Sequence, residues 1–305
     1  MRVLIVANGK IEEGRFSHFV NEQIKALQAE GVEIVCFGIT SKGLLGYMKC
    51  ARKLIKKIKE TKPDIIHAHY GLTGLCANLQ RKVPVVTTYH GSDIHSKGWR
   101  LALSKLSVKL SAHNIFVSIK LLEISGAKPS KSSIIPCGID MATMQSIPRG
   151  DAKNLLKRTS PFVLFSGSFS NEIKNPSLAK ESVAKIPELE LVELDGYSRY
   201  ETNLLINAAD CFLLTSHREG SPQVIKEAMA CGTPIVSVDV GDVKDVIGGT
   251  KGCFLAEYNA DDIANKIREA LAFGQKTDGR KRIVELGFDN NLIARKIISI
   301  YRAVL

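Results

Sequence analysis

Short apolar runs alternate with longer amphipathic stretches along most of the chain. In the first half the apolar runs are VLIVA, EIVCFGI, DIIHAH, VPVVTTY, NIFVS and SIIPCGI. Such an alternation is typical of a parallel sheet with helices on both faces. Between residues 141 and 161 the strands stop, and Pro148, Gly150 and a polar run predict a linker. A second doubly wound sheet is predicted from FVLFSGS, LELVELDGY, ADCFLLTS, TPIVSVDV and GCFLAEY.

The chain is therefore expected to be an α/β protein of two domains, because 305 residues can bury two cores. We assign residues 1–145 to the first domain and residues 146–287 to the second. A helix is predicted over 288–305, with apolar residues at helical spacing: Leu292, Ile293, Ile297, Ile300 and Tyr301.

The stretch 217–245 predicts a loop, a helix, a strand and a second loop. Ser221 is a good N-cap, and Pro222 fits the first helical position because its missing N–H would be unpaired there. The helix is expected to bury one face only. Glu219 lies just ahead of its N-terminus, where free N–H groups favour a phosphate, and Glu227 lies beside the apolar face. Either the two carboxylates flank a phosphate site, or Glu219 complements the helix dipole and Glu227 is solvated.

This stretch resembles the signature of the retaining nucleotide-sugar glycosyltransferases of family 4. These enzymes have the GT-B fold, in which two Rossmann-like domains face a cleft and a C-terminal helix crosses back to the first domain. The positions that match in register are Glu219, Gly220, Pro222, Glu227, Ala228, Met229, Ala230, Gly232, Thr233 and Pro234. The resemblance implies that Glu227 holds the donor ribose and that Glu219 faces the transferred sugar. Donor contacts are also implied for the loop between them, at Gly220, Ser221 and Pro222, although the family usually has Phe or Leu in place of the serine.

TYHGSD and IPCGID resemble two further patterns of the family. His67 and His69 end one predicted strand and His90 ends the next, so polar side chains gather at one sheet edge, where ligands bind in parallel sheets. The resemblance implies that His90 reaches the donor sugar, and it assigns His69 and Asp93 to the acceptor side. From the residues alone, His67 could equally be a hydrogen-bonded core residue and Asp93 a loop-capping carboxylate.

The segment FSGSFSNEIKNP is similar to the diphosphate-binding segment of the family, which has an Arg and then a Lys. Lys174 occupies the Lys position, whereas Ser168 stands where the Arg is expected. Arg218 and Arg15 are candidates to replace the missing charge, unless both are surface arginines. In the first βα loop many relatives have paired glycines near the phosphates, and Gly14 is the expected counterpart here.

Several other classes of protein lack support in this sequence. There is no G-x-G-x-x-G after a strand, no P-loop and no metal-ligand cluster, so neither a cofactor nor a metal is expected. The seven scattered cysteines are typical of buried thiols in a reducing compartment. No signal peptide is predicted, and no apolar run approaches about 20 residues, so we expect a cytoplasmic protein.

The positive charge is concentrated in the first half. Residues 1–150 contain 22 Lys/Arg and 10 Asp/Glu, whereas residues 151–305 contain 20 and 21, so the net charges are +12 and −1. The first half is therefore expected to meet an acidic or lipid-linked saccharide acceptor. The helical segment Lys42–Lys59 carries seven Lys/Arg; either its basic face is merely solvated or it docks peripherally on an anionic membrane. Nucleic acid is not expected, because the basic residues lack interleaved aromatics.

The resemblance implies transfer of a hexosyl group from a nucleotide diphosphate sugar, with retention of configuration and without a metal, in the synthesis of cell-surface polysaccharide or glycolipid. One alternative is a nucleotide-sugar 2-epimerase, which shares the GT-B fold and the donor. Another is a non-catalytic nucleotide-sugar binding paralogue, which the missing Arg suggests.

Overall fold

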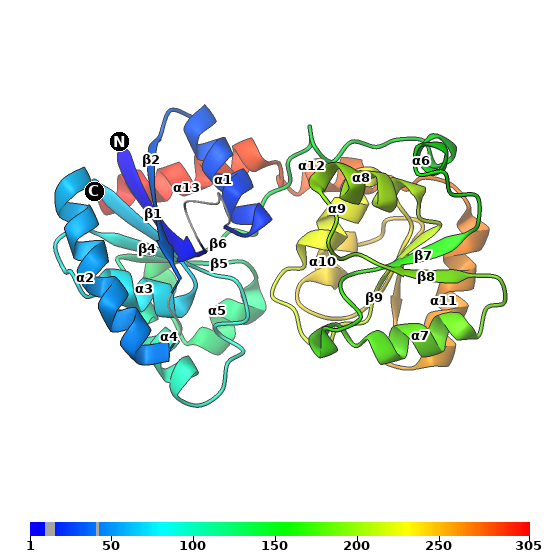
Figure 1. Ribbon diagram of the computed structural model, residues 1–305, viewed down its shortest axis with the longest axis horizontal. Helices are drawn as coiled ribbons and strands as arrows, with labels where there is room; N and C mark the ends of the chain where they lie inside the picture. The colour runs from blue at the N-terminus through cyan, green and yellow to red at the C-terminus, as the bar shows by residue number, and fades with distance from the viewer. Residues whose placement is uncertain (10–15, 41–42) are drawn as a thin grey trace. The chain divides into compact units, whose positions relative to one another are not determined.

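The computed structural model describes residues 1–9, 16–40 and 43–305, with the backbone alone for residues 43–49. The chain divides into two compact units, each built on a parallel sheet (Figure 1). The first unit comprises Met1–Gly138 together with Asn290–Leu305, and the second comprises Ile139–Asp289. The two α/β units predicted from the sequence are therefore present.

In the first unit, the described residues form a six-stranded sheet of order β2-β1-β3-β4-β5-β6. Its strands are β1 (Arg2–Asn8), β2 (Glu33–Ile39), β3 (Ile65–His69), β4 (Val85–Tyr89), β5 (His113–Phe116) and β6 (Ser132–Ile134). Its helices are α1 (His18–Ala29), α2 (Gly43–Thr61), α3 (Gly71–Asn78), α4 (Trp99–Leu110), α5 (Ile119–Ser125) and α13 (Asn290–Val304).

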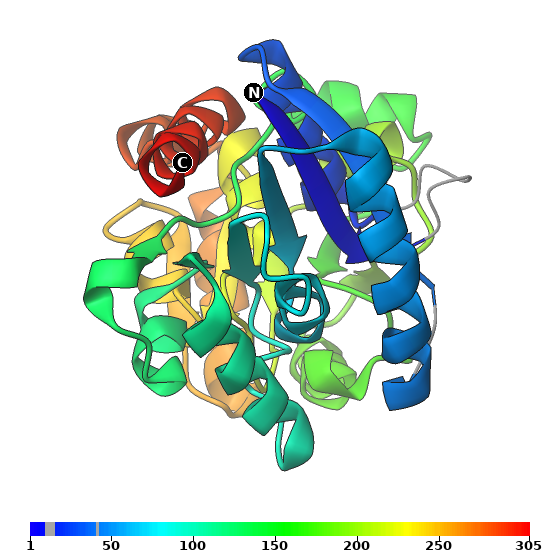
Figure 2. The ribbon, with the colours of Figure 1, turned by 90° about the vertical axis from the view of Figure 1, so that its left-hand side faces the viewer.

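Helices cover both faces of this sheet. The helices α1 and α13 pack together on one face, and α2, α3 and α4 form a layer on the other (Figures 1 and 2). Right-handed crossovers place α1 on the face opposite to α2, α3 and α4. The reason is that the chain moves from β1 toward one edge of the sheet to reach β2, and then moves in the opposite direction through β3, β4 and β5 to β6. The helix α13 buries Ile293, Ile297 and Tyr301 in the core of the first unit, so the predicted return of this helix is confirmed. Leu292, predicted on the same face, is instead exposed.

In the second unit, the described residues form a five-stranded sheet of order β11-β10-β9-β7-β8. Its strands are β7 (Phe162–Phe165), β8 (Glu190–Glu193), β9 (Cys211–Leu214), β10 (Ile235–Val238) and β11 (Cys253–Ala256). Its helices are α6 (Arg149–Leu155), α7 (Pro176–Ala184), α8 (Arg199–Ala208), α9 (Gln223–Cys231), α10 (Val243–Ile247), α11 (Ala260–Phe273) and α12 (Gly279–Glu285).

The order of the strands marks a binding position in each sheet. After β7 the chain crosses to β8, and after β9 it crosses in the opposite direction to β10. In the first sheet, the chain likewise crosses in opposite directions after the adjacent strands β1 and β3. Loops at such switch points leave a crevice at the carboxyl ends of the strands, where α/β proteins bind ligands.

The structure differs from the predicted linker at residues 141–161. This segment contains α6, and Met144 and Ala152 are fully buried in the core of the second unit. The backbone N–H of Ile139 also donates to Phe288 O at 2.7 Å within that unit. The first unit therefore ends at Gly138, before residue 145, because apolar side chains of the polar-looking segment pack on the second core.

Candidate functional site

Two side chains of opposite charge meet beyond the carboxyl ends of β7 and β9. The Nζ of Lys174 donates to Glu219 Oε1 at 2.7 Å, and the two side chains are 20% and 17% exposed. The hydroxyl of Ser216 donates to the same carboxylate oxygen at 2.8 Å. The structure thus brings together Lys174, which was predicted to bind the diphosphate, and Glu219, which was predicted to face the sugar.

The neighbouring backbone holds Lys174 in place. The hydroxyl of Thr215, which follows β9, donates to the carbonyl oxygens of Lys174 and Asn175, both at 2.9 Å. Gly167 lies under the lysine stem, and a Cβ there would be 3.2 Å from Lys174 Cγ. A larger residue at Gly167 would displace the stem, so the local sequence favours this position of the ammonium group.

Glu227 has a partner that the sequence did not predict. The Nη1 of Arg199 donates to Glu227 Oε1 at 2.8 Å, and the carboxylate side chain is 5% exposed. Arg199 is the first residue of α8, which begins with a capping box formed by Ser198 and Glu201. That S-x-x-E pattern directly after the β8 strand is the sequence signal that would have placed Arg199 at this sheet edge.

The prediction that α9 buries one face only is wrong. Every residue from Ile225 to Cys231 is buried, including Lys226 and Glu227. The reason is that α9 contacts α8, α10, α12 and β10 and so has neighbours on all sides. Glu227 is accordingly enclosed and not solvated.

The start of α9 also differs from the prediction. The helix begins after Pro222, which takes the N-cap position, and Ser221 is not the N-cap. The Ser221 hydroxyl donates instead to Asp242 Oδ2 at 2.6 Å. Burial raises the pKa of the Asp242 carboxyl. Gly241 lies so close to Gly220 O that an added Cβ would be 3.0 Å from it, so the loop after β10 lies against the predicted donor loop.

The surroundings of Ser168 are acidic. Its hydroxyl lies 3.4 Å from Glu193 Oε2, and the backbone N–H of the following residue donates to the same oxygen at 2.6 Å. Arg218, one candidate for the missing charge, is exposed beside Glu219 in the sequence. Gly14 and the other candidate, Arg15, lie outside the described residues.

Three histidines stack at the carboxyl ends of β3 and β4. The ring centroids of His67 and His69 are 4.6 Å apart, and those of His69 and His90 are 5.3 Å apart. His69 Nδ1 lies 3.0 Å from His90 Nε2, and Cys137 Sγ lies 3.7 Å from His90 Nδ1. Both ring nitrogens of His90 thus face groups of the first unit.

The inner two histidines are neutral. His67 bonds to Tyr301 Oη at 2.5 Å and to Thr88 Oγ1 at 2.7 Å, which links α13 to the sheet. Burial lowers the pKa of His67 far below its ordinary value and lowers that of His69 to about 3. His67 is therefore a core residue. His69 offers His90 an uncharged hydrogen-bond partner, which can fix the tautomer of His90.

Asp93 caps backbone groups of its own unit. Its Oδ1 accepts from the N–H groups of Gly91 at 3.0 Å and Ile94 at 3.1 Å, and its Oδ2 accepts from Gly71 N–H at 3.0 Å. Burial nevertheless raises the pKa of this carboxyl to about 6. The loop-capping alternative thus describes what Asp93 does in the structure.

Replacing Asp93 with Asn should change how stability depends on pH. The folded chain binds the Asp93 proton more tightly than the unfolded chain does. The contribution of Asp93 to the free energy of unfolding is therefore highest below pH 3.8 and decreases as the pH rises to about 6. Asp93→Asn should lose this slope and also about 1–3 kcal/mol, because its amide would face Gly71 N–H. Urea unfolding at several pH values measures both; equal slopes for the two proteins would contradict the assignment.

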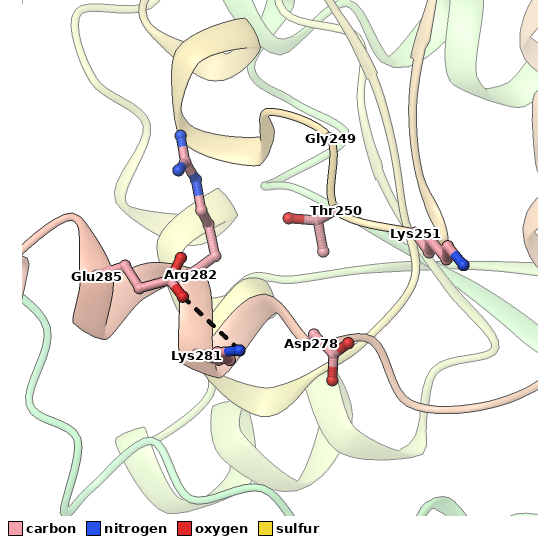
Figure 3. Close-up of a pocket in the computed structure, with 7 residues that line it drawn as sticks. All are labelled: Gly249, Thr250, Lys251, Asp278, Lys281, Arg282 and Glu285. Carbon is pink, nitrogen blue, oxygen red and sulfur yellow. Dashed lines mark ion pairs between the residues drawn. The ribbon is translucent and has the colours of Figure 1, made fainter.

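A pocket of about 450 Å³ lies elsewhere in the second unit (Figure 3). It is lined by Gly249, Thr250, Lys251, Asp278, Lys281, Arg282 and Glu285. An ion pair of 3.9 Å joins Lys281 and Glu285 across one turn of α12. None of the residues predicted at the donor or acceptor site lines this pocket.

No three His, Cys, Asp or Glu side chains in the described part of the chain are grouped so that they could hold a metal ion. No helix in residues 1–9, 16–40 and 43–305 combines the length and the hydrophobicity that crossing a bilayer demands.

Comparison with known proteins gives consistent matches. The family model described as Glycosyltransferase Family 4 matches residues 18–143, and the one described as Glycosyl transferases group 1 matches residues 189–285. The putative teichuronic acid biosynthesis glycosyltransferase TuaC of Bacillus subtilis is 26% identical, over 85% of this chain and 76% of that protein. The UDP-Gal:alpha-D-GlcNAc-diphosphoundecaprenol alpha-1,3-galactosyltransferase of Escherichia coli is 27% identical, over 82% and 76%.

Solved structures show the same fold. Sucrose-phosphate synthase from Thermosynechococcus elongatus superposes with a TM-score of 0.84 at 17% identity, covering 99% of this chain and 98% of that one. Anabaena HepE in complex with UDP gives a TM-score of 0.78 at 16% identity, covering 99% and 100%. With the paired parallel sheets, the returning α13 and family matches in both units, the chain belongs to the group 1 glycosyltransferases and has the GT-B fold.

Proposed function

We propose that this glycosyltransferase moves a hexosyl group from a nucleotide diphosphate sugar to a saccharide acceptor with retention of configuration. The observation that carries the proposal is the Lys174–Glu219 pair at the switch point of the second sheet. It supplies an ammonium group for the diphosphate next to a carboxylate for the sugar. Glu227, enclosed in the same unit, would bind the ribose hydroxyls.

The chemistry needs stabilisation of the leaving diphosphate. As the bond between the anomeric carbon and the phosphate oxygen breaks, negative charge grows on that oxygen, and Lys174 with backbone N–H groups would stabilise it. The acceptor oxygen attacks the same face of the sugar, and its proton passes to the departing phosphate. Because Lys174 supplies the cation, we expect turnover to be unaffected by EDTA. His90 would contact the sugar and so act on turnover more than on nucleotide affinity.

The acceptor is proposed to be a lipid-linked or acidic saccharide. One similar protein is named for a diphosphoundecaprenol-linked acceptor and another for teichuronic acid biosynthesis. The basic first unit suits an acidic acceptor. Within the described part of α2, Arg52, Lys53, Lys56 and Lys59 are exposed, which would also suit a peripheral position on an anionic membrane.

The test begins with thermal unfolding in the presence of a panel of nucleoside diphosphates. A ligand at about 100 times its Kd stabilises a protein by about 2.7 kcal/mol, so the preferred base should stand out. The matching nucleotide sugar is then incubated with and without candidate acceptors. Acceptor-dependent transfer supports the proposal. Epimerisation of the donor without acceptor would establish the epimerase alternative, and binding with neither reaction would establish a non-catalytic paralogue.

Arg218 is expected to replace part of the charge lost at Ser168. Losing a charged hydrogen bond at the transition state costs about 1.5–3 kcal/mol, so Arg218→Ala should slow transfer about tenfold or more. Adding Ser168→Arg should then restore part of the rate, although Glu193 will attract the new side chain. Arg15→Ala, alone and with Ser168→Arg, is the parallel arm. Normal rates in both alanine variants would leave the site with Lys174 and backbone N–H groups alone.

A further inference from the structure

The helix α4 buries two serines and exposes two large apolar side chains. Its buried side chains are Ser104, Ser107 and Val108. The large apolar residues Trp99 and Leu106 are instead 55% and 43% exposed. A helix at the surface of a globular protein normally buries its large apolar side chains and exposes its polar ones.

Close packing against α3 explains the buried serines. A Cβ added at Gly71 would lie 2.4 Å from Ser104 Oγ, and one at Gly74 would lie 2.5 Å from Ser107 Oγ. The two helices therefore approach at glycine and serine positions, where larger side chains would not fit. The leucines of α4 have no room on this face.

The outward apolar residues form a continuous stripe. Trp99, Leu103, Leu106 and Leu110 are spaced by four, three and four residues, so they lie within a narrow sector of the helix. Leu103 and Leu110 are half-buried, and the other two are exposed. Exposed apolar stripes of this kind commonly mark an interaction surface.

The charges around the stripe point to the partner. The sequence of α4, WRLALSKLSVKL, contains three cations and no acidic residue. Arg100, Lys105 and Lys109 are exposed on the helix, and Lys97 is exposed just before it. The guanidinium of Arg100 lies 5.4 Å from the centroid of the Trp99 ring. Cations beside leucines and a tryptophan are the composition of helices that lie in the interface of an anionic bilayer.

We propose that the stripe formed by Trp99, Leu103, Leu106 and Leu110 of α4 docks on an anionic lipid surface. The leucines and Trp99 enter the boundary between headgroups and acyl chains, while Lys105 and Lys109 remain at the lipid phosphates. This surface differs from the basic face of α2, from which α3 separates α4. Docking requires neither donor nor acceptor, so it can be tested separately from sugar transfer.

Trp99 is the sole tryptophan of the chain, so its fluorescence reports on this surface alone. The chain is mixed with vesicles of phosphatidylcholine, or with vesicles in which about a third of the lipid is phosphatidylglycerol. We expect the Trp99 emission to shift to shorter wavelength with the anionic vesicles only, and the shift to disappear at high salt. Brominated lipids should quench the shifted emission.

Leu106→Glu is the decisive variant, because an exposed position tolerates a charge without unfolding. Its partition onto anionic vesicles, measured by co-sedimentation, should fall about tenfold or more. The matched control is Leu155→Glu in the second unit, where Leu155 is 59% exposed, and it should bind as the parent chain does.

Other outcomes would overturn the proposal. Unchanged binding of Leu106→Glu would exclude the stripe, and equal binding to neutral vesicles would exclude an anionic partner. An emission shift that grows with protein concentration in the absence of vesicles, together with an increase in mass, would show that a second copy of the chain covers the stripe. Loss of vesicle binding in Lys53→Gln/Lys56→Gln, with Leu106→Glu unaffected, would assign docking to α2.

Discussion

Sugar transfer by the Lys174→Ala variant should be about tenfold to a hundredfold slower than transfer by the parent chain. The variant loses a charged hydrogen bond to the leaving diphosphate, worth about 1.5–3 kcal/mol. It also leaves the Glu219 carboxylate without its 2.7 Å partner at the place where negative charge develops. Both effects act in the same direction, so this is the largest loss expected from a single site.

Steady-state kinetics on folded protein measure this effect. Lys185→Ala is the matched control, because Lys185 pairs with Asp261 at 2.8 Å on the surface of the same unit. Exposed pairs contribute little, so the control should keep its rate and its stability. If Lys174→Ala transfers sugar as fast as the control, Lys174 does not bind the diphosphate.

Glu227→Ala should weaken nucleotide binding and the fold together. Loss of the ribose hydrogen bonds is expected to weaken binding by about 1.5–3 kcal/mol. The variant also leaves Arg199 facing a largely buried position without its carboxylate, which should lower the free energy of unfolding by about 3 kcal/mol. The two losses have different origins and can therefore be separated.

The double variant Glu227→Ala/Arg199→Ala makes that separation. Removing Arg199 as well takes away the uncompensated charge, so stability in urea should partly recover. Nucleotide affinity, measured by calorimetry, should not recover, because the ribose ligand is still missing. Full affinity in Glu227→Ala would exclude the ribose role, whereas recovery of affinity in the double variant would assign the whole effect to Arg199.

The strands of both sheets were predictable from the sequence, because strands that are buried on both faces consist of nearly continuous apolar residues. The proximity of Lys174 and Glu219 was also predictable. Their loops follow the neighbouring strands β7 and β9, after which the chain crosses in opposite directions. The capping-box pattern S-x-x-E could have placed Arg199 at this sheet edge, at the start of α8. Its pairing with Glu227 was not predictable, because no local pattern shows which segments converge there. The enclosure of Glu227 was missed for a similar reason, because it results from the helices packed around α9.

The surface of the first unit shows a different limit of sequence reasoning. Helical periodicity alone would turn the leucines of α4 inward. The glycines of α3 instead favour burial of the serine face of α4, because only side chains as small as serine fit between the two backbones. In α2, likewise, Leu54 is buried whereas the adjacent Ile55 is exposed. Which face of a helix is buried depends on its neighbour as well as on its own sequence.

The position of α13 has a consequence for synthesis of the chain on the ribosome. This helix completes the core of the first unit, yet roughly 150 residues of the second unit are translated before it. At about 5–20 residues per second, translation of those residues takes roughly eight to thirty seconds, during which the α13 side of the first core is incomplete. The contiguous second unit is therefore expected to finish folding first, and the nascent first unit should bind chaperones until Tyr301 reaches His67.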